Sequence, residues 1–106
     1  MKASLGMFAL LTALTANADA TDPEALARSK HCFSCHVLDR ETHAPSFKLL
    51  AQNYGGIANA DYMLERKVQW GGLGHWGAEP MPAAGPRPAV SEAEAKVLVA
   101  WILGLK

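Results

Sequence analysis

Two cysteines and a histidine stand together in the sequence as Cys32-Phe33-Ser34-Cys35-His36, a C-x-x-C-H pattern. With two residues between them, the thiols can form thioether bonds to neighbouring vinyl groups of one porphyrin. The residue that follows can then bring its imidazole to the iron. The pattern is typical of haem c attachment. It predicts one haem, bound covalently through Cys32 and Cys35, with His36 as an axial ligand.

A redox-active dithiol and a zinc site are the two alternatives for these residues. The dithiol of thioredoxin-like proteins belongs to a βαβ setting, which this sequence does not indicate. A closed zinc site needs four ligands, and His31, His43 and His75 add no second pair at ligand spacing. Both alternatives explain these residues less well than haem attachment does.

The second axial ligand has to come from elsewhere in the chain, and Met81 is the prediction. It stands between Pro80 and Pro82, whose fixed φ angles reduce the loop freedom that is lost when a thioether is held at the iron. The competitor is His75, which lies in the same loop and is a better metal donor. Met63 is interpreted instead as a core methionine on a helix.

Two more residues are candidates for the haem site. The carbonyl at Pro45, or the one before it, can accept the N–H of His36 and so set the orientation and basicity of the imidazole. Trp76 can pack at the haem edge and donate its indole N–H to a propionate oxygen. Trp70 is interpreted as a packing or surface residue.

Helices are expected to position these side chains. Asp22 as N-cap and Pro23 at the first helical position begin a helix that should run into the cysteine pair. A short helix should contain Phe47 and end at 54–56, where a glycine can cap it. A third helix should begin near Asn59 and stop at two glycines; its apolar positions are Ile57, Tyr62, Met63 and Val68.

Residues 71–90 form one long loop, because they contain five of the nine glycines and four of the six prolines. The last helix starts at a capping box of Ser91 and Glu94. Its buried stripe is expected to consist of Val97, Leu98, Trp101, Ile102 and Leu105. No segment alternates like a strand and no repeat is visible, so the predicted architecture is all-α.

The first twenty residues have the order of a secretory signal peptide: Lys2, an apolar run, then small residues. Cleavage is expected after Ala18 or Ala20, which leaves a single domain over 21–106. The alternative is a membrane anchor, but threonines interrupt the apolar run, and it is shorter than the roughly 20 residues that a bilayer requires. We therefore expect an exported protein without stable membrane insertion.

The charge balance restricts the partners. The whole chain has 10 Lys and Arg against 10 Asp and Glu. Nucleic-acid and anionic-membrane partners usually require a basic surplus or a basic patch. The expected partners are therefore proteins, with no nucleic acid among them.

The sequence resembles the small bacterial monohaem class I cytochromes c of the cytochrome c-551 type, and the likeness spans almost all of 21–106. The motifs that carry it are Asp22-Pro23-Glu24, the run from Lys30 to His36, Ala44-Pro45-Ser46-Phe47-Lys48, Gly74-His75-Trp76-Gly77, Pro80-Met81-Pro82, Ala89-Val90-Ser91 and the helix with Trp101. The spacing from His36 to Met81 also matches.

The resemblance implies a class I cytochrome c fold of four to five helices wrapped around one covalently bound haem. It implies His36 and Met81 as axial ligands, Pro45 supporting His36, and Trp76 donating to a propionate. It further implies a periplasmic one-electron carrier, not an enzyme, which passes electrons between an upstream donor and a terminal reductase or oxidase. We expect a monomer that docks only briefly with these redox proteins.

Two features depart from the family. Residues 83–88 make the link after Pro82 longer than usual, and they lack the asparagine whose amide lies near the methionine sulfur in the family. The first helix has Ala27 where a bulky apolar residue is usual. We expect effects on the sulfur orientation and on the packing around Trp101.

Two other functions remain open at this point. One is a tightly bound electron-transfer subunit of a dehydrogenase complex, which would copurify with a large subunit. The other is an enzyme or gas sensor with a displaceable sixth ligand, which would bind carbon monoxide when reduced.

Overall fold

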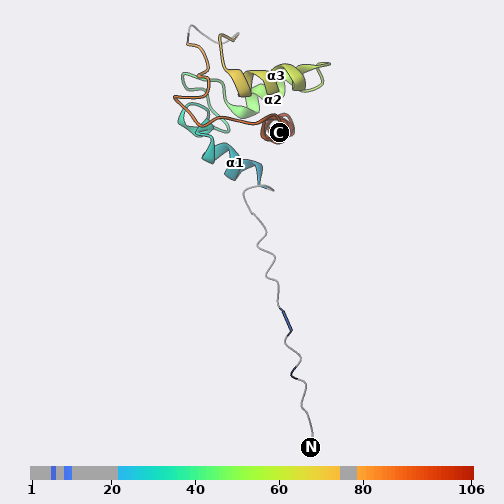
Figure 1. Ribbon diagram of the computed structural model, residues 1–106. Coiled ribbons are helices and arrows are strands. Elements are labelled where there is room, and N and C mark those ends of the chain that lie inside the picture. Colours follow the sequence, from blue (N-terminus) through green and yellow to red (C-terminus); the bar gives the residue numbers. More distant parts are fainter. Residues whose placement is uncertain (1–5, 7–8, 11–21, 75–78) are drawn as a thin grey trace, which may run out of the picture.

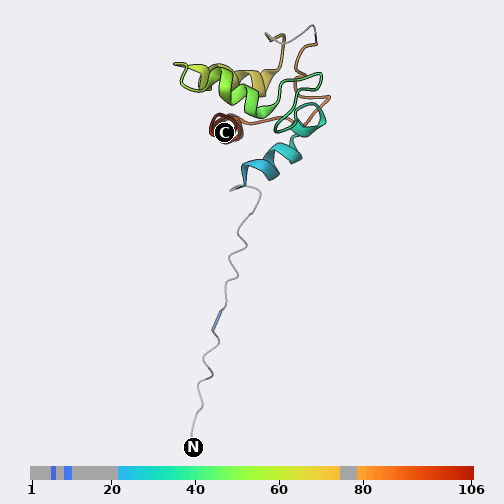
Figure 2. The same ribbon diagram turned by 180° about the vertical axis from the view of Figure 1, so that it is seen from behind.

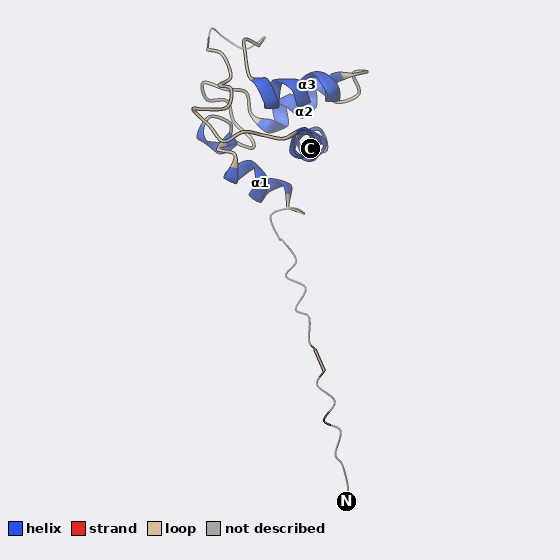
Figure 3. Cartoon of the chain, viewed as in Figure 1, coloured by secondary structure: helices blue, strands red, loops and turns tan. Residues whose placement is uncertain are grey.

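Helices and loops make up the computed structural model, which describes residues 6, 9–10, 22–74 and 79–106. In chain order the elements are α1 (Pro23–Ser29), the 3-10 turn η2 (Cys32–Ser34), α2 (Phe47–Tyr54), α3 (Ala60–Trp70) and α4 (Glu92–Leu103). Figure 3 shows no β-strand in the described part of the chain. The predicted all-α architecture is confirmed. None of the helices within those residues is long and apolar enough to cross a membrane.

The start of α1 agrees with its prediction, but its end does not. The Asp22 carboxylate accepts the backbone N–H groups of Glu24 (3.0 Å) and Ala25 (3.3 Å), which caps the helix. The helix was expected to run into the cysteine pair, yet it stops at Ser29. His31 has a left-handed backbone (φ 63°), which interrupts the helical hydrogen bonds. The cysteine turn is therefore a separate element with its own orientation.

The two middle helices occupy the predicted segments. The Ser46 hydroxyl caps α2 by accepting the N–H of Leu49, and α3 follows Asn59 as expected. Of the expected apolar positions of α3, Val68 packs against the core, but Ile57, Tyr62 and Met63 do not. Tyr62 is 61% exposed and Met63 is 40% exposed. The interpretation of Met63 as a core methionine is therefore wrong, because its side chain borders the cavity described below.

The central helix is α4, which contacts α1, α2 and α3. Figures 1 and 2 show it end-on, between α1 on one side and the pair α2 and α3 on the other. Its predicted capping box is present: the Ser91 hydroxyl accepts the N–H of Glu94, and the Glu94 carboxylate accepts the N–H of Ser91. The predicted stripe is partly wrong, because Val97 is exposed. The buried side chains of α4 are Ala95, Leu98, Val99 and Ile102.

The core lies where α1 crosses α4. Leu26, Ala27, Val90, Ala95 and Leu98 form one buried cluster. Ala27 is completely buried, so the small side chain brings the two helices close together. Beside this cluster the Trp101 ring contacts two other aromatic rings, those of Phe33 (centroids 6.4 Å apart) and Phe47 (5.4 Å). Edge and tilted contacts of this kind stabilise aromatic clusters.

Candidate haem site

The C-x-x-C-H segment is one compact turn. The backbone N–H of His36 donates to the Cys32 carbonyl at 2.9 Å, and the N–H of Cys35 donates to the same oxygen at 3.3 Å. Both thiols are half-buried and are not joined in a disulfide. The turn places the two thiols and the imidazole along one wall of a single cavity.

The imidazole of His36 is held by two contacts. Its Nδ1 lies 2.7 Å from the Pro45 carbonyl oxygen. A carbonyl can only accept, so Nδ1 carries the proton and the lone pair of Nε2 stays free. The ring stacks on Phe47 with centroids 5.1 Å apart and planes inclined by 20°. An imidazole fixed in this tautomer is suited to binding a metal through Nε2.

The environment keeps His36 neutral. Burial lowers the pKa of the imidazole, and the nearby His43 acts in the same direction, although the hydrogen bond to Pro45 opposes them. Burial also raises the pKa of the Cys32 thiol, against the opposing positive charges of Arg87 and Lys30. The uncharged thiol is thus favoured in the absence of covalent attachment.

Met81 lies on another part of the same cavity wall. An isolated antiparallel bridge fixes its backbone: the Gly72 N–H donates to the Met81 carbonyl at 2.8 Å, and the Met81 N–H donates to the Gly72 carbonyl at 3.0 Å. The neighbouring Gly71 lies so close that an added Cβ would meet the backbone of residues 81–83. The methionine is therefore held against the C-terminal end of α3 through main-chain contacts.

The cavity has a volume of about 490 Å³. Cys32, Cys35, His36, Pro45 and Met81 all line it. Most of the remaining wall is apolar, including Leu50, Leu64, Val68, Leu98, Val99 and Ile102. A largely apolar cavity of this size with a few polar groups is typical of a cofactor site. The thiols, the neutral imidazole and the thioether fit a covalently attached haem.

The other candidates are in different positions. Trp76 and the competing ligand His75 fall outside the described residues. Trp70 is 66% exposed, which agrees with a surface residue. His31 and His43 are also exposed, and His43 borders the cavity. Within the described ranges, no group of three or more His, Cys, Asp and Glu side chains is placed to hold a metal ion.

Two charged residues near the site were missed from the sequence. Lys67 lines the cavity and donates through Nζ to the Leu73 carbonyl. Arg87 is buried, with 8% of its surface exposed. The sequence offered one signal for Arg87, since it is the only charged residue between Glu79 and Glu92.

The fold and this site together define a c-type cytochrome. Residues 20–106 match the family of cytochrome c. The chain belongs to the cytochrome c family and has the class I fold. Its cofactor is one covalently attached haem c. It is a monohaem electron carrier and not an enzyme.

Individual relatives are similar over most of the chain. Cytochrome c-551 of Pseudomonas aeruginosa is 38% identical over 98% of this chain and 96% of its own. Cytochrome c-551 of Azotobacter vinelandii is 45% identical over 76% of this chain and 93% of its own. The crystal structure of Nitrosomonas europaea cytochrome c552 is 36% identical and covers 78% of this chain and 99% of its own, with a TM-score of 0.70. The resemblance to the cytochrome c-551 type is confirmed.

Proposed function

We propose that this cytochrome is a periplasmic one-electron carrier in which His36 and Met81 bind the haem iron from its two sides. In this proposal Cys32 and Cys35 form the two thioether bonds. The observation that supports it is that all four side chains line one apolar cavity. When bound, the haem supplies an iron that alternates between the ferric and ferrous states.

His36 meets the requirements of a permanent ligand. The Pro45 carbonyl holds the proton on Nδ1, and Phe47 stacks on the ring. These contacts leave Nε2 as the donor and restrict rotation of the imidazole. The N–H donated to a carbonyl also raises the basicity of the ligand.

Met81 meets the requirements of the second ligand. Its backbone is fixed by the bridge to Gly72, and its side chain is half-buried at the cavity. A His/Met pair gives the iron a higher reduction potential than two histidines, because a thioether is the poorer donor. With both positions occupied by protein, the reaction is electron transfer and not oxygen chemistry. We propose that Trp76 donates to a propionate.

The test is the absorption spectrum of the oxidised holoprotein. Ligation by Met81 predicts a weak red band from sulfur-to-iron charge transfer. The band should vanish in Met81→Ala and survive in His75→Ala. Loss of the band in His75→Ala, with Met81→Ala unaffected, would assign the ligand to the histidine. Carbon monoxide should bind to reduced Met81→Ala far more readily than to the reduced wild type.

Location and partners form the rest of the proposal. We propose that residues 1–20 are a cleaved signal peptide and that residues 21–106 work as the mature domain in the periplasm. Intact mass should then show a mature chain that starts at Asp19 or Thr21, with one haem added. The proposed partners are an upstream donor and a terminal reductase or oxidase, met through interfaces below about 1,200 Å². Copurification with a dehydrogenase subunit, the alternative that the relatives do not support, would contradict a free carrier.

A further inference from the structure

Arg87 lies in the part of the chain that departs from the family, residues 83–88. Only 8% of its surface is exposed. Among the ion pairs of the described residues, none includes Arg87. Burying a guanidinium without a carboxylate is unfavourable unless hydrogen bonds satisfy its N–H groups. The hydrogen-bond acceptors of the guanidinium therefore show what holds this side chain inside the protein.

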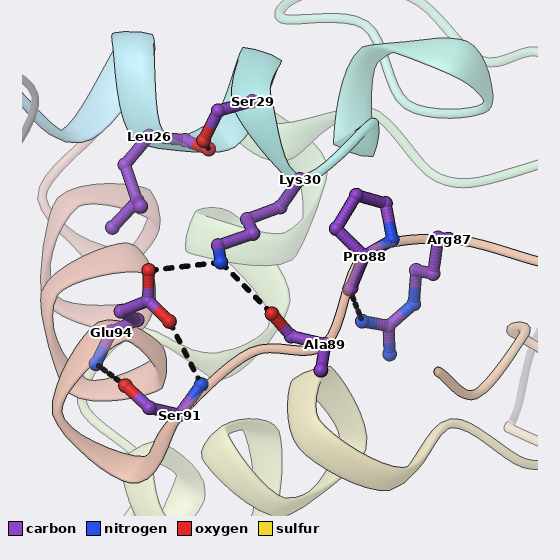
Figure 4. Close-up of polar contacts among 8 residues, drawn as sticks. All are labelled: Leu26, Ser29, Lys30, Arg87, Pro88, Ala89, Ser91 and Glu94. Atoms are coloured by element: carbon purple, nitrogen blue, oxygen red, sulfur yellow. Dashed lines mark hydrogen bonds and ion pairs between the residues drawn. The ribbon is translucent and has the colours of Figure 1, made fainter. Parts of the chain in front are cut away.

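Those partners are backbone carbonyls from two segments. Nε donates to the Pro82 carbonyl at 2.7 Å, and Nη2 donates to the Val68 carbonyl in the last turn of α3. A longer bond of 3.4 Å joins Nη1 to the Pro88 carbonyl, which Figure 4 shows. The side chain thus connects α3 with the residue that follows Met81.

The shape of the guanidinium makes this connection specific. Its N–H groups point in fixed directions within one plane, so one side chain can donate to two carbonyls on different segments. A lysine has a single nitrogen on a flexible chain and cannot reproduce this fork of two fixed donors, Nε and Nη2. The bridge between Gly72 and Met81 holds one side of the methionine, and the Arg87 bond to Pro82 holds the other.

We propose that Arg87 is a positioning residue for Met81: by fastening Pro82 to Val68, its guanidinium holds the methionine segment against α3 and keeps the thioether at the cavity. The proposal rests on the proposed ligation by Met81. A ligand that competes with the thioether must open this segment, so the fork opposes displacement of the methionine.

The experiment is an imidazole titration of the oxidised holoprotein, followed by the loss of the sulfur-to-iron band. Hydrogen bonds to a charged group stabilise by about 1.5–3 kcal/mol. Arg87→Met should therefore bind imidazole at least about tenfold more tightly than the wild type. Arg87→Lys keeps the positive charge but loses the fork, and it should shift in the same direction. If Arg87→Met does not accumulate as folded holoprotein, Arg87→Lys is the variant that tests the proposal.

Two control variants separate positioning from other effects. Arg66→Met removes an exposed arginine from α3 and should keep the wild-type imidazole affinity. Asp22→Ala removes the cap of α1, at the far end of that helix from the cysteine turn, and lowers global stability. It too should keep the wild-type affinity. Unfolding in guanidinium measures the stability of each variant.

Three results would overturn the proposal. One is an unchanged imidazole affinity in Arg87→Met. Another is a wild-type affinity in Arg87→Lys, which would assign the effect to charge instead of the fork. The third is an equal shift in Asp22→Ala at similar stability loss. A wild-type protein without the red band would instead refute ligation by Met81, so the two failures are distinguishable.

Discussion

Replacement of Gly71 by alanine should displace the Met81 segment. Gly71 has φ 65° and ψ −152°, a region that is essentially restricted to glycine. An added Cβ would also meet the Met81 carbonyl oxygen and would lie 2.8 Å from the Ala83 nitrogen and 2.8 Å from the Pro82 carbonyl carbon. All three contacts are backbone atoms, so no side chain can rotate away to make room.

The expected loss of stability is the sum of a backbone contribution and a steric contribution. The backbone conformation alone costs an alanine about 1–3 kcal/mol. The steric term adds about 1–3 kcal/mol of the kind measured when atoms are forced into a packed site. Gly71→Ala should therefore destabilise the protein by about 2–6 kcal/mol, a large part of the roughly 5–15 kcal/mol of a typical domain.

Gly72→Ala is the matched control. Gly72 also has a positive φ (108°), but a Cβ there would meet only the end of the Lys67 side chain, at 3.7 Å. It should lose only the backbone term and keep the sulfur-to-iron band. Guanidinium unfolding and the red band of the oxidised holoproteins measure both effects. Equal stability losses in the two variants, with the band intact in Gly71→Ala, would refute the steric argument.

The remaining predictions concern the core and the α4 cap. Phe47 is 2% exposed and stacks on His36, so Phe47→Ala should cost about 3–5 kcal/mol in guanidinium unfolding; a loss below about 1 kcal/mol would contradict its role in the core. Glu94 accepts the Ser91 N–H and pairs with Lys30 at 3.0 Å (Figure 4), and these contacts lower its pKa. Its ionised form therefore stabilises the protein above the unfolded pKa of about 4.3, and that contribution is lost as the pH falls through the lower folded pKa. The stability difference between wild type and Glu94→Gln should be constant from pH 6 to 7 and shrink in acid; a difference that grows in acid would contradict this assignment.

The sequence predicted the elements whose causes are local. The cap at Asp22 and the capping box at Ser91 depend on side chains within three residues of the helix start, so their positions could be predicted. The C-x-x-C-H pattern likewise predicted that the two thiols and the imidazole lie at one site, because its geometry lies within one segment. The prediction that α1 reaches the cysteines failed at His31, since a left-handed backbone is uncommon at any residue other than glycine and the residue type alone does not reveal it.

The burial pattern depended on contacts between distant segments. Helical periodicity identifies an apolar face but does not say whether another helix or a cavity lies against it. Met63 was therefore assigned to the core although it borders the cavity. The carbonyls that bind Arg87 come from residues 68 and 82, and only the folded chain brings them together.

The bridge between Gly72 and Met81 uses only main-chain atoms. Side chains next to it, such as Ala83 and Ala84, are exposed and take no part in these bonds. The outer surface of the loop can therefore accumulate substitutions while the path of its backbone is preserved. Variation at these positions would change the outer surface of the carrier and leave the backbone hydrogen bonds at Met81 intact.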